Sequence, residues 1–352
     1  MVLNAALLGF GNVGQALAEL LIEKQNTLRQ DFDVELRIVG IATGSHGQAI
    51  DPGGIDLRQA LEIRRAGSSL EALHSGHPID DPFRFLADSP IDLLFESTPT
   101  NVEDGQPAYA YVFGALERGV HVVTANKGPV AFGYRELAAL ARRKNVGFLF
   151  ESTVMDGAPV LAIGREGLPA NPIVRVRGVL NSTTNYILTR MEQDELSFDQ
   201  ALGAAQEIGI AETDPTLDID GWDSAVKTVI LANVLMGADL RPLDVERQGI
   251  RHITLADVQA ARAAGECIRL ICQAERQPEG GVVASVTPQR VPVQDILASV
   301  TGTSSIVDLE TETLPCVTIV EHDPGPTTTA YGMLADMINI LRGRHLTDIL
   351  PM

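Results

Sequence analysis

The chain has 352 residues, of which 45% are hydrophobic, and 46 acidic side chains against 27 basic ones give it a formal net charge of −19. This length is typical of two domains, and the composition is sufficient for a core in each. The acidic balance disfavours nucleic acid and an anionic membrane surface as partners, because both require a positive field. We attribute the acidity itself to solubility.

The cysteines, Cys267, Cys272 and Cys316, are few and irregularly spaced. They indicate neither a disulfide framework nor a metal site, and we interpret them as reduced thiols in the core. No uninterrupted apolar run reaches the roughly 18–20 residues that a membrane-spanning helix requires. The first residues also lack the basic region of a signal peptide. These observations favour a cytoplasmic protein with no membrane partner.

The first 150 residues alternate between predicted strands and helices. An apolar run at 2–8 ends in glycines and predicts a buried strand, helical spacing follows over 14–30, and 35–42 is the next strand. Further strands are predicted at 91–96, 121–124 and 146–150, with helices at 56–74, 106–118 and 133–144. This alternation is typical of a parallel, doubly wound sheet. We therefore expect a Rossmann-type α/β domain over residues 1–150.

The pattern changes after residue 151. Residues 173–181 alternate apolar and polar side chains, as a strand with one covered face does. Helices are predicted near 183–193, 197–208 and 222–237, and strands near 268–275, 282–287 and 316–321. We expect an α+β catalytic and dimerisation domain over 151–325. A last segment, 326–352, contains a predicted helix near 327–342 that we expect to return to the nucleotide-binding domain.

A glycine-rich turn lies between the first strand and the first helix. Gly9 permits a tight turn, Gly11 lets the backbone approach a pyrophosphate, and Gly14 lets helix and strand pack closely. The phosphates are then expected at the positive end of the helix. An isolated pattern of this kind is also found in incidental turns, but here a strand leads in and a helix leads out. The candidate cofactor-binding residues are Gly9, Phe10, Gly11, Asn12, Val13 and Gly14.

The loop after the second strand bears on the choice of cofactor. It has no acid for a ribose 2′-hydroxyl and no arginine for a 2′-phosphate. Thr43, Ser45 and His46 are either ligands of a 2′-phosphate or ordinary exposed loop residues. The sequence therefore predicts NADP or NAD without choosing between them.

The densest group of acids lies between Glu212 and Lys227, around the start of the helix predicted at 222–237. Asp223 and Lys227 are four residues apart and share one face of that helix. The residues after Lys227 are apolar enough for a buried helix. Two interpretations remain open, a solvated ion pair without function and a proton-transfer lysine in a polar pocket.

From the glycine turn to the last helix, the chain resembles the homoserine dehydrogenase family. The matching segments are Ala125-Asn126-Lys127, Glu151-Ser152-Thr153-Val154, Gly178 to Ile187, Glu212 to Lys227 and Gly325 to Ala330. The segment from Glu212 to Lys227 is far more specific than the glycines. The resemblance implies a reversible, NAD(P)-dependent interconversion of L-homoserine and L-aspartate 4-semialdehyde, on the route to threonine and methionine.

The resemblance also implies roles for charged residues. Lys227 matches the lysine that transfers a proton at the C4 oxygen of the substrate. Lys127 matches a second active-site lysine near the nicotinamide and the substrate. Glu212, Asp218 and Asp223 match the acids that hold the ammonium and hydroxyl ends of the substrate or orient the lysine.

Further matches lie in loops. Thr183 belongs to the loop that contacts substrate, where Ser182 replaces the family's usual glycine. Thr98, Thr100 and Lys127 match cofactor contacts after the third and fourth strands. These residues complete the predicted set of cofactor and substrate contacts.

Residues 151–159 resemble the family's monovalent-cation loop, in which backbone carbonyls are the main ligands. The carbonyls of Glu151, Val154, Asp156 and Ala158 would match them, so the resemblance implies a sodium site. Met155 and Asp156 stand where the family has small residues, often glycines. This departure alters the geometry of the site or adds an anionic ligand.

Two other functions compete with the one that the resemblance implies. Another two-domain NAD(P)-dependent amino-acid or semialdehyde dehydrogenase or reductase fits the glycine turn equally well, but a phosphorylating enzyme would need a nucleophilic cysteine in a site segment. A non-catalytic dinucleotide sensor would lack the acids and lysines of the second domain.

The resemblance also bears on assembly and regulation. Family members are commonly homodimers paired through the second domain, and we expect the same here. Many bacterial relatives continue after the last helix into a small regulatory domain that binds threonine. Because this chain ends shortly after the helix at 327–342, we also expect weak or absent inhibition by threonine of that kind.

Overall fold

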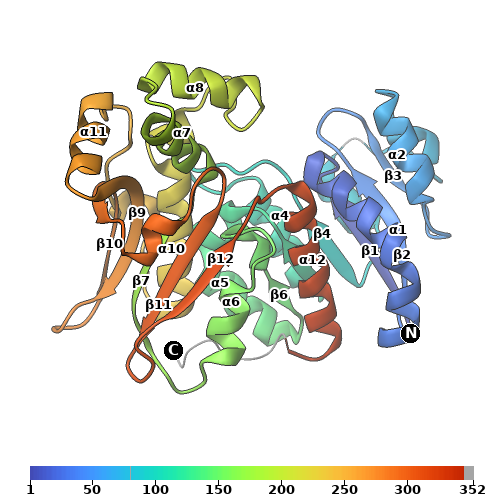
Figure 1. Cartoon of the computed structure of the whole chain (residues 1–352). Coiled ribbons are helices and arrows are strands. Elements are labelled where there is room, and N and C mark those ends of the chain that lie inside the picture. The colour runs from blue at the N-terminus through green and yellow to red at the C-terminus, as the bar shows by residue number, and fades with distance from the viewer. Residues whose placement is uncertain (80, 345–352) are drawn as a thin grey trace. The chain divides into compact units, whose positions relative to one another are not determined.

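The computed structural model describes residues 1–79 and 81–344 and divides into two compact units (Figure 1). The described part of unit 1 comprises Met1–Pro159 and residues 325–344, and unit 2 comprises Val160–Pro324. The predicted last segment, 326–352, therefore extends into residues 345–352, which lie outside the described residues.

Unit 1 is built on a six-stranded sheet of order β3-β2-β1-β4-β5-β6. Its strands are β1 (Val2–Leu8), β2 (Glu35–Ala42), β3 (Gln48–Ile50), β4 (Leu93–Glu96), β5 (His121–Thr124) and β6 (Phe148–Leu149). All neighbours pair in parallel except β2 and β3, which are antiparallel. The prediction of a Rossmann-type doubly wound sheet is confirmed, with an antiparallel edge strand that the sequence analysis did not predict.

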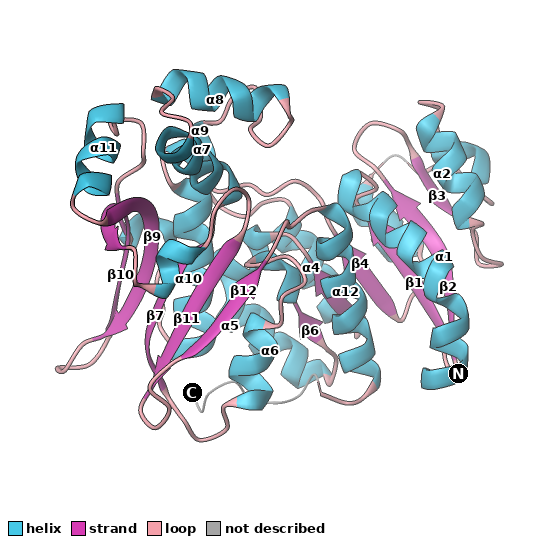
Figure 2. Ribbon diagram, in the orientation of Figure 1, coloured by secondary structure: helices cyan, strands magenta, loops and turns pink. Residues whose placement is uncertain are grey.

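Helices cover this sheet (Figure 2). They are α1 (Asn12–Phe32), α2 (Leu57–Arg65), α3 (Pro82–Asp88), α4 (Ala108–Glu117), α5 (Lys127–Lys144) and α12 (Pro326–Leu341), with single turns at Leu70–Leu73 and η2 (Glu151–Thr153). Helices α1 and α12 contact each other, and Leu17, Met333 and Met337 from them join Leu7 of β1 in one buried cluster. Burial of such side chains is the main favourable term in folding. The C-terminal helix is thus part of the core of unit 1.

Two helix predictions in unit 1 were wrong in extent. The helix predicted over 56–74 ends at Arg65, because Gly67 adopts a φ of 68° that ends regular helix. The helix predicted over 133–144 begins at Lys127, since the side chain of Asn126 caps it by accepting a hydrogen bond from the Gly128 amide. Gly133 interrupts this helix with non-helical angles, which explains why its helical spacing was visible only beyond that point.

Unit 2 contains a mixed sheet of order β12-β11-β7-β9-β10-β8. Its strands are β7 (Ile173–Val179), β8 (Glu246–Arg247), β9 (Glu266–Arg276), β10 (Val282–Pro292), β11 (Ser305–Thr311) and β12 (Val317–Glu321). Its helices are α6 (Val160–Ala162), α7 (Ser182–Gln193), α8 (Phe198–Glu207), α9 (Thr216–Ile219), α10 (Trp222–Met236) and α11 (Leu255–Ala263), with short turns at Ile163–Gly167, Pro242–Asp244 and Ile296–Ser299. The expected α+β organisation is confirmed, although the strands β8 and β11 and the helices α6, α9 and α11 were not predicted.

Helix α10 is the buried centre of unit 2. It contacts β9 and β10 (Figure 1), and glycines with positive φ lie at both of its ends, Gly221 at 82° and Gly237 at 68°. Every residue from Ser224 to Met236 is buried except Lys227. Beyond its first two residues, Trp222 and Asp223, which are also partly exposed, the helix therefore presents only the Lys227 side chain outside the core.

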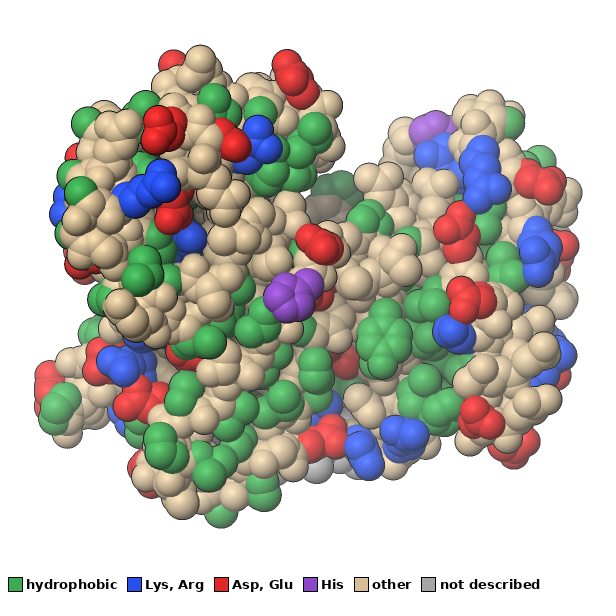
Figure 3. All heavy atoms as spheres, in the orientation of Figure 1, with side chains coloured by type: hydrophobic (Ala, Val, Ile, Leu, Met, Phe, Trp, Pro, Cys, Tyr) green, Lys and Arg blue, Asp and Glu red, His purple; other side chains and the backbone are tan. Residues whose placement is uncertain are grey.

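The surface and the cysteines complete the description. In both units the Lys and Arg side chains lie among Asp and Glu side chains on the face shown in Figure 3. In the described part of the chain no helix has the length and apolar character needed to cross a membrane. All three cysteines are free, but only Cys267 and Cys272 are buried. The interpretation of Cys316 as a core thiol was wrong, because this residue is exposed beside β12.

Candidate active site

The glycine turn of unit 1 has the geometry of a phosphate cradle. A Cβ atom on Gly9 would lie 2.6 Å from the Ser97 carbonyl, and one on Gly14 would overlap the Gly9 carbonyl oxygen. Gly11 has no protein atom within 4 Å of its Cβ position. Packing thus explains Gly9 and Gly14, whereas Gly11 leaves open space beside the backbone.

The start of helix α1 supports the same interpretation. Gly11 is its N-cap residue and provides no side-chain cap, and the first turn contains no acid. No acid of this first turn therefore offsets the unbonded amide groups or the positive end of the helix dipole. The space at Gly11 and this uncapped helix end fit the pyrophosphate of a dinucleotide.

Two further loops follow the neighbouring parallel strands. Thr98 and Thr100 follow β4, and Lys127 is the first residue of α5, three positions after the end of β5. Because β1, β4 and β5 are adjacent and parallel, their carboxyl ends lie on one edge of the sheet. The strand order reverses direction between β1 and β4, which is where ligands bind in such sheets.

The loop after β2 folds back on itself. The Thr43 hydroxyl donates to the Gly47 carbonyl at 3.1 Å and accepts from the His46 amide at 2.7 Å. The Ser45 hydroxyl lies 2.7 Å from Nδ1 of His46. Thr43 therefore closes the loop, while Ser45 is exposed and His46 is half-buried.

The predicted charged cluster of unit 2 is assembled around Lys227. Its ammonium lies 3.4 Å from the Asp223 carboxylate and donates to the Leu180 carbonyl at 2.7 Å. The two charged side chains are only 16% and 18% exposed. This pair is more enclosed than an ordinary surface ion pair, so the geometry favours the polar-pocket interpretation.

Asn181 connects the acids of this cluster. Its Nδ2 donates to Asp218 at 2.7 Å and to Asp223 at 3.1 Å, while its Oδ1 accepts from the Thr184 amide at the start of α7. Thr183 donates to the other oxygen of Asp218 at 2.9 Å. Asn181 was not among the predicted site residues, although a polar residue directly before a helix identifies an N-cap.

The electrostatic balance of the cluster is unusual. Burial raises the pKa of the Asp218 carboxyl, and the charge of Asp223 raises it further, whereas hydrogen bonds from Asn181 and Thr183 and the charge of Lys227 lower it. When both acids are ionised, two negative charges lie beside one positive charge. The cluster is thus suited to a second cation.

Glu212 lies apart from these bonds. It is exposed, and its backbone carbonyl accepts a hydrogen bond from the Gln206 side chain at 3.1 Å. Of the residues predicted for the substrate, the structure brings Asp218, Asp223, Thr183 and Lys227 together through hydrogen bonds and an ion pair, and Glu212 stands on the preceding segment.

The segment predicted to bind a cation is held by helix α12. The Glu151 amide donates to Asp336 at 2.8 Å, and the Ser152 hydroxyl donates to the Thr329 carbonyl at 2.8 Å. Asp156 has a φ of 41° and accepts from the Thr328 hydroxyl at 3.1 Å. Asp156 thus adopts a left-handed conformation that glycine usually takes, and its carboxylate is engaged by the first turn of α12.

The other predicted carbonyls of this segment come from Val154 and Ala158, and the amide of Ala158 donates to Met155 at 2.8 Å. No cluster of three or more His, Cys, Asp or Glu side chains suited to a metal ion is found in residues 1–79 and 81–344. A cation in this segment would therefore depend on backbone carbonyls.

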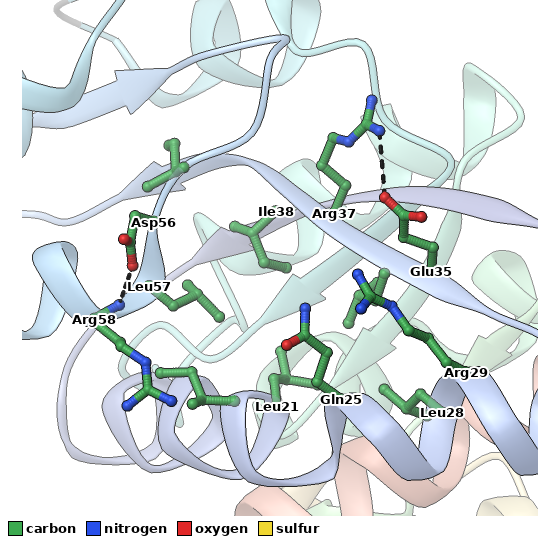
Figure 4. A pocket seen from close by; sticks show the side chains of 13 residues that line it. Leu21, Gln25, Leu28, Arg29, Glu35, Arg37, Ile38, Asp56, Leu57 and Arg58 are labelled. Carbon is green, nitrogen blue, oxygen red and sulfur yellow. Dashed lines mark hydrogen bonds and ion pairs between the residues drawn. The ribbon is translucent and has the colours of Figure 1, made fainter.

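A separate cavity of about 300 Å³ opens in unit 1 between α1, β2 and residues 55–58 (Figure 4). Apolar side chains line it together with Arg29, Arg37 and Arg58, and the acids Glu35 and Asp56 lie among these arginines. None of the predicted site residues lines this cavity. It is therefore distinct from both candidate sites.

Comparisons with known proteins agree with this arrangement. Residues 159–338 match the family described as homoserine dehydrogenase, and residues 9–151 match the family described as homoserine dehydrogenase, NAD binding domain. A homoserine dehydrogenase of Methanocaldococcus jannaschii is 38% identical over 96% of this chain and 98% of its own length. An NAD(+)-dependent homoserine dehydrogenase of Pseudomonas canavaninivorans is 38% identical over 95% of both chains.

A solved structure is similar over nearly the same extent. It is a hyperthermophilic archaeal homoserine dehydrogenase in complex with NADPH, 32% identical, with a TM-score of 0.83 over 97% of this chain and 98% of its own. The relatives thus include one named for NAD(+) and one solved with NADPH. The chain belongs to the homoserine dehydrogenase family, whose members are NAD(P)-dependent oxidoreductases that interconvert L-homoserine and L-aspartate 4-semialdehyde in amino-acid biosynthesis.

Proposed function

We propose that Lys227 is the proton-transfer residue of this homoserine dehydrogenase. Reduction of the aldehyde places negative charge on its oxygen, and an ammonium group at that point both stabilises the charge and donates the proton. In the reverse direction the neutral amine accepts the proton of the hydroxyl group. The enclosed ammonium of Lys227, held by Asp223 and the Leu180 carbonyl, is the observation that carries this proposal.

The acids have complementary roles in this proposal. Asp223 orients Lys227, because the two side chains are ion-paired on one face of α10. Asp218 and Glu212 bind the ammonium group of the substrate, which needs a carboxylate partner once it leaves water. The excess negative charge of the cluster supports this assignment, and Thr183 holds Asp218 in place.

Unit 1 is proposed to bind the cofactor. The turn from Gly9 to Gly14 holds the pyrophosphate, while Thr98, Thr100 and Lys127 contact the nicotinamide half. When bound, the nicotinamide supplies or accepts the hydride. Lys127 adds a positive charge at the edge of the sheet where that half is expected.

Other features of the family remain proposals here. Residues 1–150 are proposed to form the dinucleotide-binding domain and 151–325 the substrate and dimerisation domain. We propose a cytoplasmic homodimer, with a sodium ion bound by the carbonyls of Glu151, Val154, Asp156 and Ala158. Three free cysteines support a reducing compartment.

The assigned role of Lys227 can be tested with purified protein. Homoserine is mixed with NAD or NADP at alkaline pH, and the absorbance of the reduced nicotinamide is followed. Lys227→Ala should lower kcat by about 10²–10⁴-fold while the dissociation constant of NADH changes by less than about twofold. Turnover near that of the wild type would show that Lys227 does not transfer the proton.

A further inference from the structure

Glu96 is a buried acid that the proposed reaction does not use. It is the last residue of β4, the strand that lies between β1 and β5 in the sheet of unit 1. Its side chain is inaccessible to solvent, whereas the other three residues of the strand, Leu93, Leu94 and Phe95, are apolar. Burying an acid at this position is costly unless its oxygens are well supplied with donors.

Both carboxylate oxygens of Glu96 accept hydrogen bonds. Oε1 accepts from the Thr98 amide at 2.8 Å, from the Thr98 hydroxyl at 2.5 Å and from Nδ2 of Asn126 at 3.5 Å. Oε2 accepts from the Thr124 hydroxyl at 2.6 Å. Thr98 lies in the loop after β4, Thr124 is the last residue of β5, and Asn126 lies in the loop after β5.

The donors are themselves connected. Asn126 also donates to the Thr98 carbonyl at 3.0 Å and to the Pro99 carbonyl at 3.3 Å, and the Asn126 amide donates to the Thr124 hydroxyl at 2.9 Å. Asn126 is the N-cap of α5, directly before Lys127. One carboxylate thus holds Thr98, near the start of the loop after β4, and also Thr124 and Asn126, which lead into α5.

We propose that Glu96 is a positioning residue for the nicotinamide half of the cofactor site, acting through the loops that carry Thr98, Thr100 and Lys127. In a doubly wound sheet the half that contains β1 and β2 holds one nucleotide and the half that contains β4 and β5 holds the other. The side-chain hydrogen bonds of Glu96 all go to residues of the second half, whereas its contact with the first half is the backbone pairing with Leu8 of β1. Its loss should therefore loosen one end of the cofactor and leave the other end unchanged.

This inference deepens the proposed function, because it depends on the cofactor contacts assigned to Thr98, Thr100 and Lys127. Binding of NADH by the wild type and by Lys227→Ala tests the proposed function separately. A negative result with Glu96 variants would therefore contradict only the role of Glu96.

The experiment compares three proteins, the wild type, Glu96→Gln and Glu96→Leu. NADH binding is followed by nicotinamide fluorescence, and ADP-ribose, the same cofactor without its nicotinamide, is measured by competition. If the wild type binds NADPH more tightly than NADH, NADPH replaces NADH in these measurements, and ADP-ribose with a 2′-phosphate replaces ADP-ribose. Leucine keeps the approximate volume and removes every acceptor, whereas glutamine keeps one carbonyl oxygen and can donate to Thr124.

We expect Glu96→Leu to raise the dissociation constant of NADH about tenfold and that of ADP-ribose by less than about twofold. Glu96→Gln should recover NADH affinity to within about threefold of the wild type. The KM of the cofactor should follow these values, while the KM of homoserine at saturating cofactor stays nearly constant. Equal weakening of NADH and ADP-ribose, an unchanged NADH constant, or equal impairment by leucine and glutamine would overturn the proposal.

Two further variants separate positioning from a loss of stability. Phe95→Leu alters the buried neighbour on the same strand without removing a hydrogen bond, so it should lower the melting temperature and leave the ratio of the NADH and ADP-ribose constants unchanged. Thr124→Val removes one donor without changing the acid, and it tests the proposal if Glu96→Leu does not fold. It should raise the dissociation constant of NADH selectively. An equal rise in the dissociation constants of NADH and ADP-ribose would again contradict the role of Glu96.

Discussion

At the level of single residues, the most informative contact is the amide of Asn181 shared by two carboxylates. Its hydrogen bond lowers the pKa of Asp218, against the upward effects of burial and of Asp223. Asn181 also caps helix α7. Its effect on the acids can be separated from its effect on the helix, because serine is an equally good cap and is too short to bridge both acids.

We predict that Asn181→Ser moves the acid limb of the pH profile of kcat/KM to higher pH. Without this donor the pKa of Asp218 rises further, so the carboxyl takes up its proton at a higher pH and loses the charge that binds the substrate ammonium. At neutral pH the loss in kcat/KM should be about tenfold, as expected for a hydrogen bond to a charged group. The profile is measured with saturating cofactor.

Thr254→Ala is the matched control for Asn181→Ser. Thr254 caps helix α11 in the same unit, and its hydroxyl is bonded to Asp257 of that helix. This variant should lose about 1 kcal/mol of stability with an unchanged pH profile. A profile that moves equally in both variants would mean that Asn181 acts only through stability.

Sequence reasoning found the charged residues of the site more readily than the neutral ones. The spacing of Asp223 and Lys227 placed them on one helix face, and their ion pair is present. Asn181 was missed because a bridging amide depends on the approach of the start of α7 to α9 and α10, and Asn181 is 37 and 42 residues from the two acids in the sequence. Glu96 was passed over as part of an apolar strand, although an acid that ends such a run is itself unusual.

At the level of elements, two glycines of the turn between β1 and α1 have different structural roles. Gly14 is required by packing, whereas Gly11 has open space around its Cβ position. We predict that Gly14→Ala lowers both stability and NADH affinity, because the new methyl group overlaps backbone that cannot move freely. Gly11→Ala should keep the melting temperature within about 1 °C of the wild-type value. It should raise the dissociation constant of NADH about tenfold or more.

Thermal unfolding and NADH fluorescence distinguish these outcomes. If Gly11→Ala bound NADH as the wild type does, the pyrophosphate would not approach the backbone at Gly11. Equal losses of stability in the two variants would instead contradict the difference in packing.

Helix α12 offers a second test of an element. A Cβ on Gly332 would lie 2.7 Å from the Asp156 carbonyl and would overlap the Ser152 hydroxyl, whereas Gly114, inside α4, has no atom within 4 Å. Both glycines are inside helices, where alanine is intrinsically favoured by roughly 0.5–1 kcal/mol. We predict that Gly114→Ala stabilises the protein and that Gly332→Ala destabilises it, as measured by denaturant unfolding. An increase in stability in both variants would show that the segment after Glu151 moves readily to make room for the new methyl group on α12.

The elements that sequence reasoning missed share a physical cause. Strand β8 has only two residues, too few to show an alternation of apolar and polar side chains, and it pairs with β10, which is distant in the sequence. Strand β11 begins and ends with polar residues, and α11 shows weak amphipathic spacing in an alanine-rich segment. By contrast, β1 and α10 contain apolar runs directly followed by glycine, and β2 ends in the apolar run Ile38–Ala42. The predicted bounds of these three elements differ from the observed ones by at most one residue.

For the whole molecule, the net charge of −19 is the dominant long-range property. Like charges repel one another more in the compact state than in the expanded one, and salt screens this repulsion. The screening length falls from about 30 Å at 0.01 M to about 10 Å at 0.1 M salt. We therefore predict that the melting temperature rises as sodium chloride increases over this range, by about 2–4 °C for each kcal/mol gained.

The choice of cation separates screening from a bound ion. Tetramethylammonium chloride screens charge as sodium chloride does, but its cation is too large for a ring of backbone carbonyls in the segment after Glu151. If only screening acts, the two salts should raise the melting temperature equally at equal ionic strength. A larger increase with sodium would support a site formed by the Glu151, Val154, Asp156 and Ala158 carbonyls, because a ligand that binds only the folded state stabilises it. A melting temperature that falls with both salts would contradict the electrostatic argument, since it would mean that attractive ion pairs outweigh the repulsion of the excess acids.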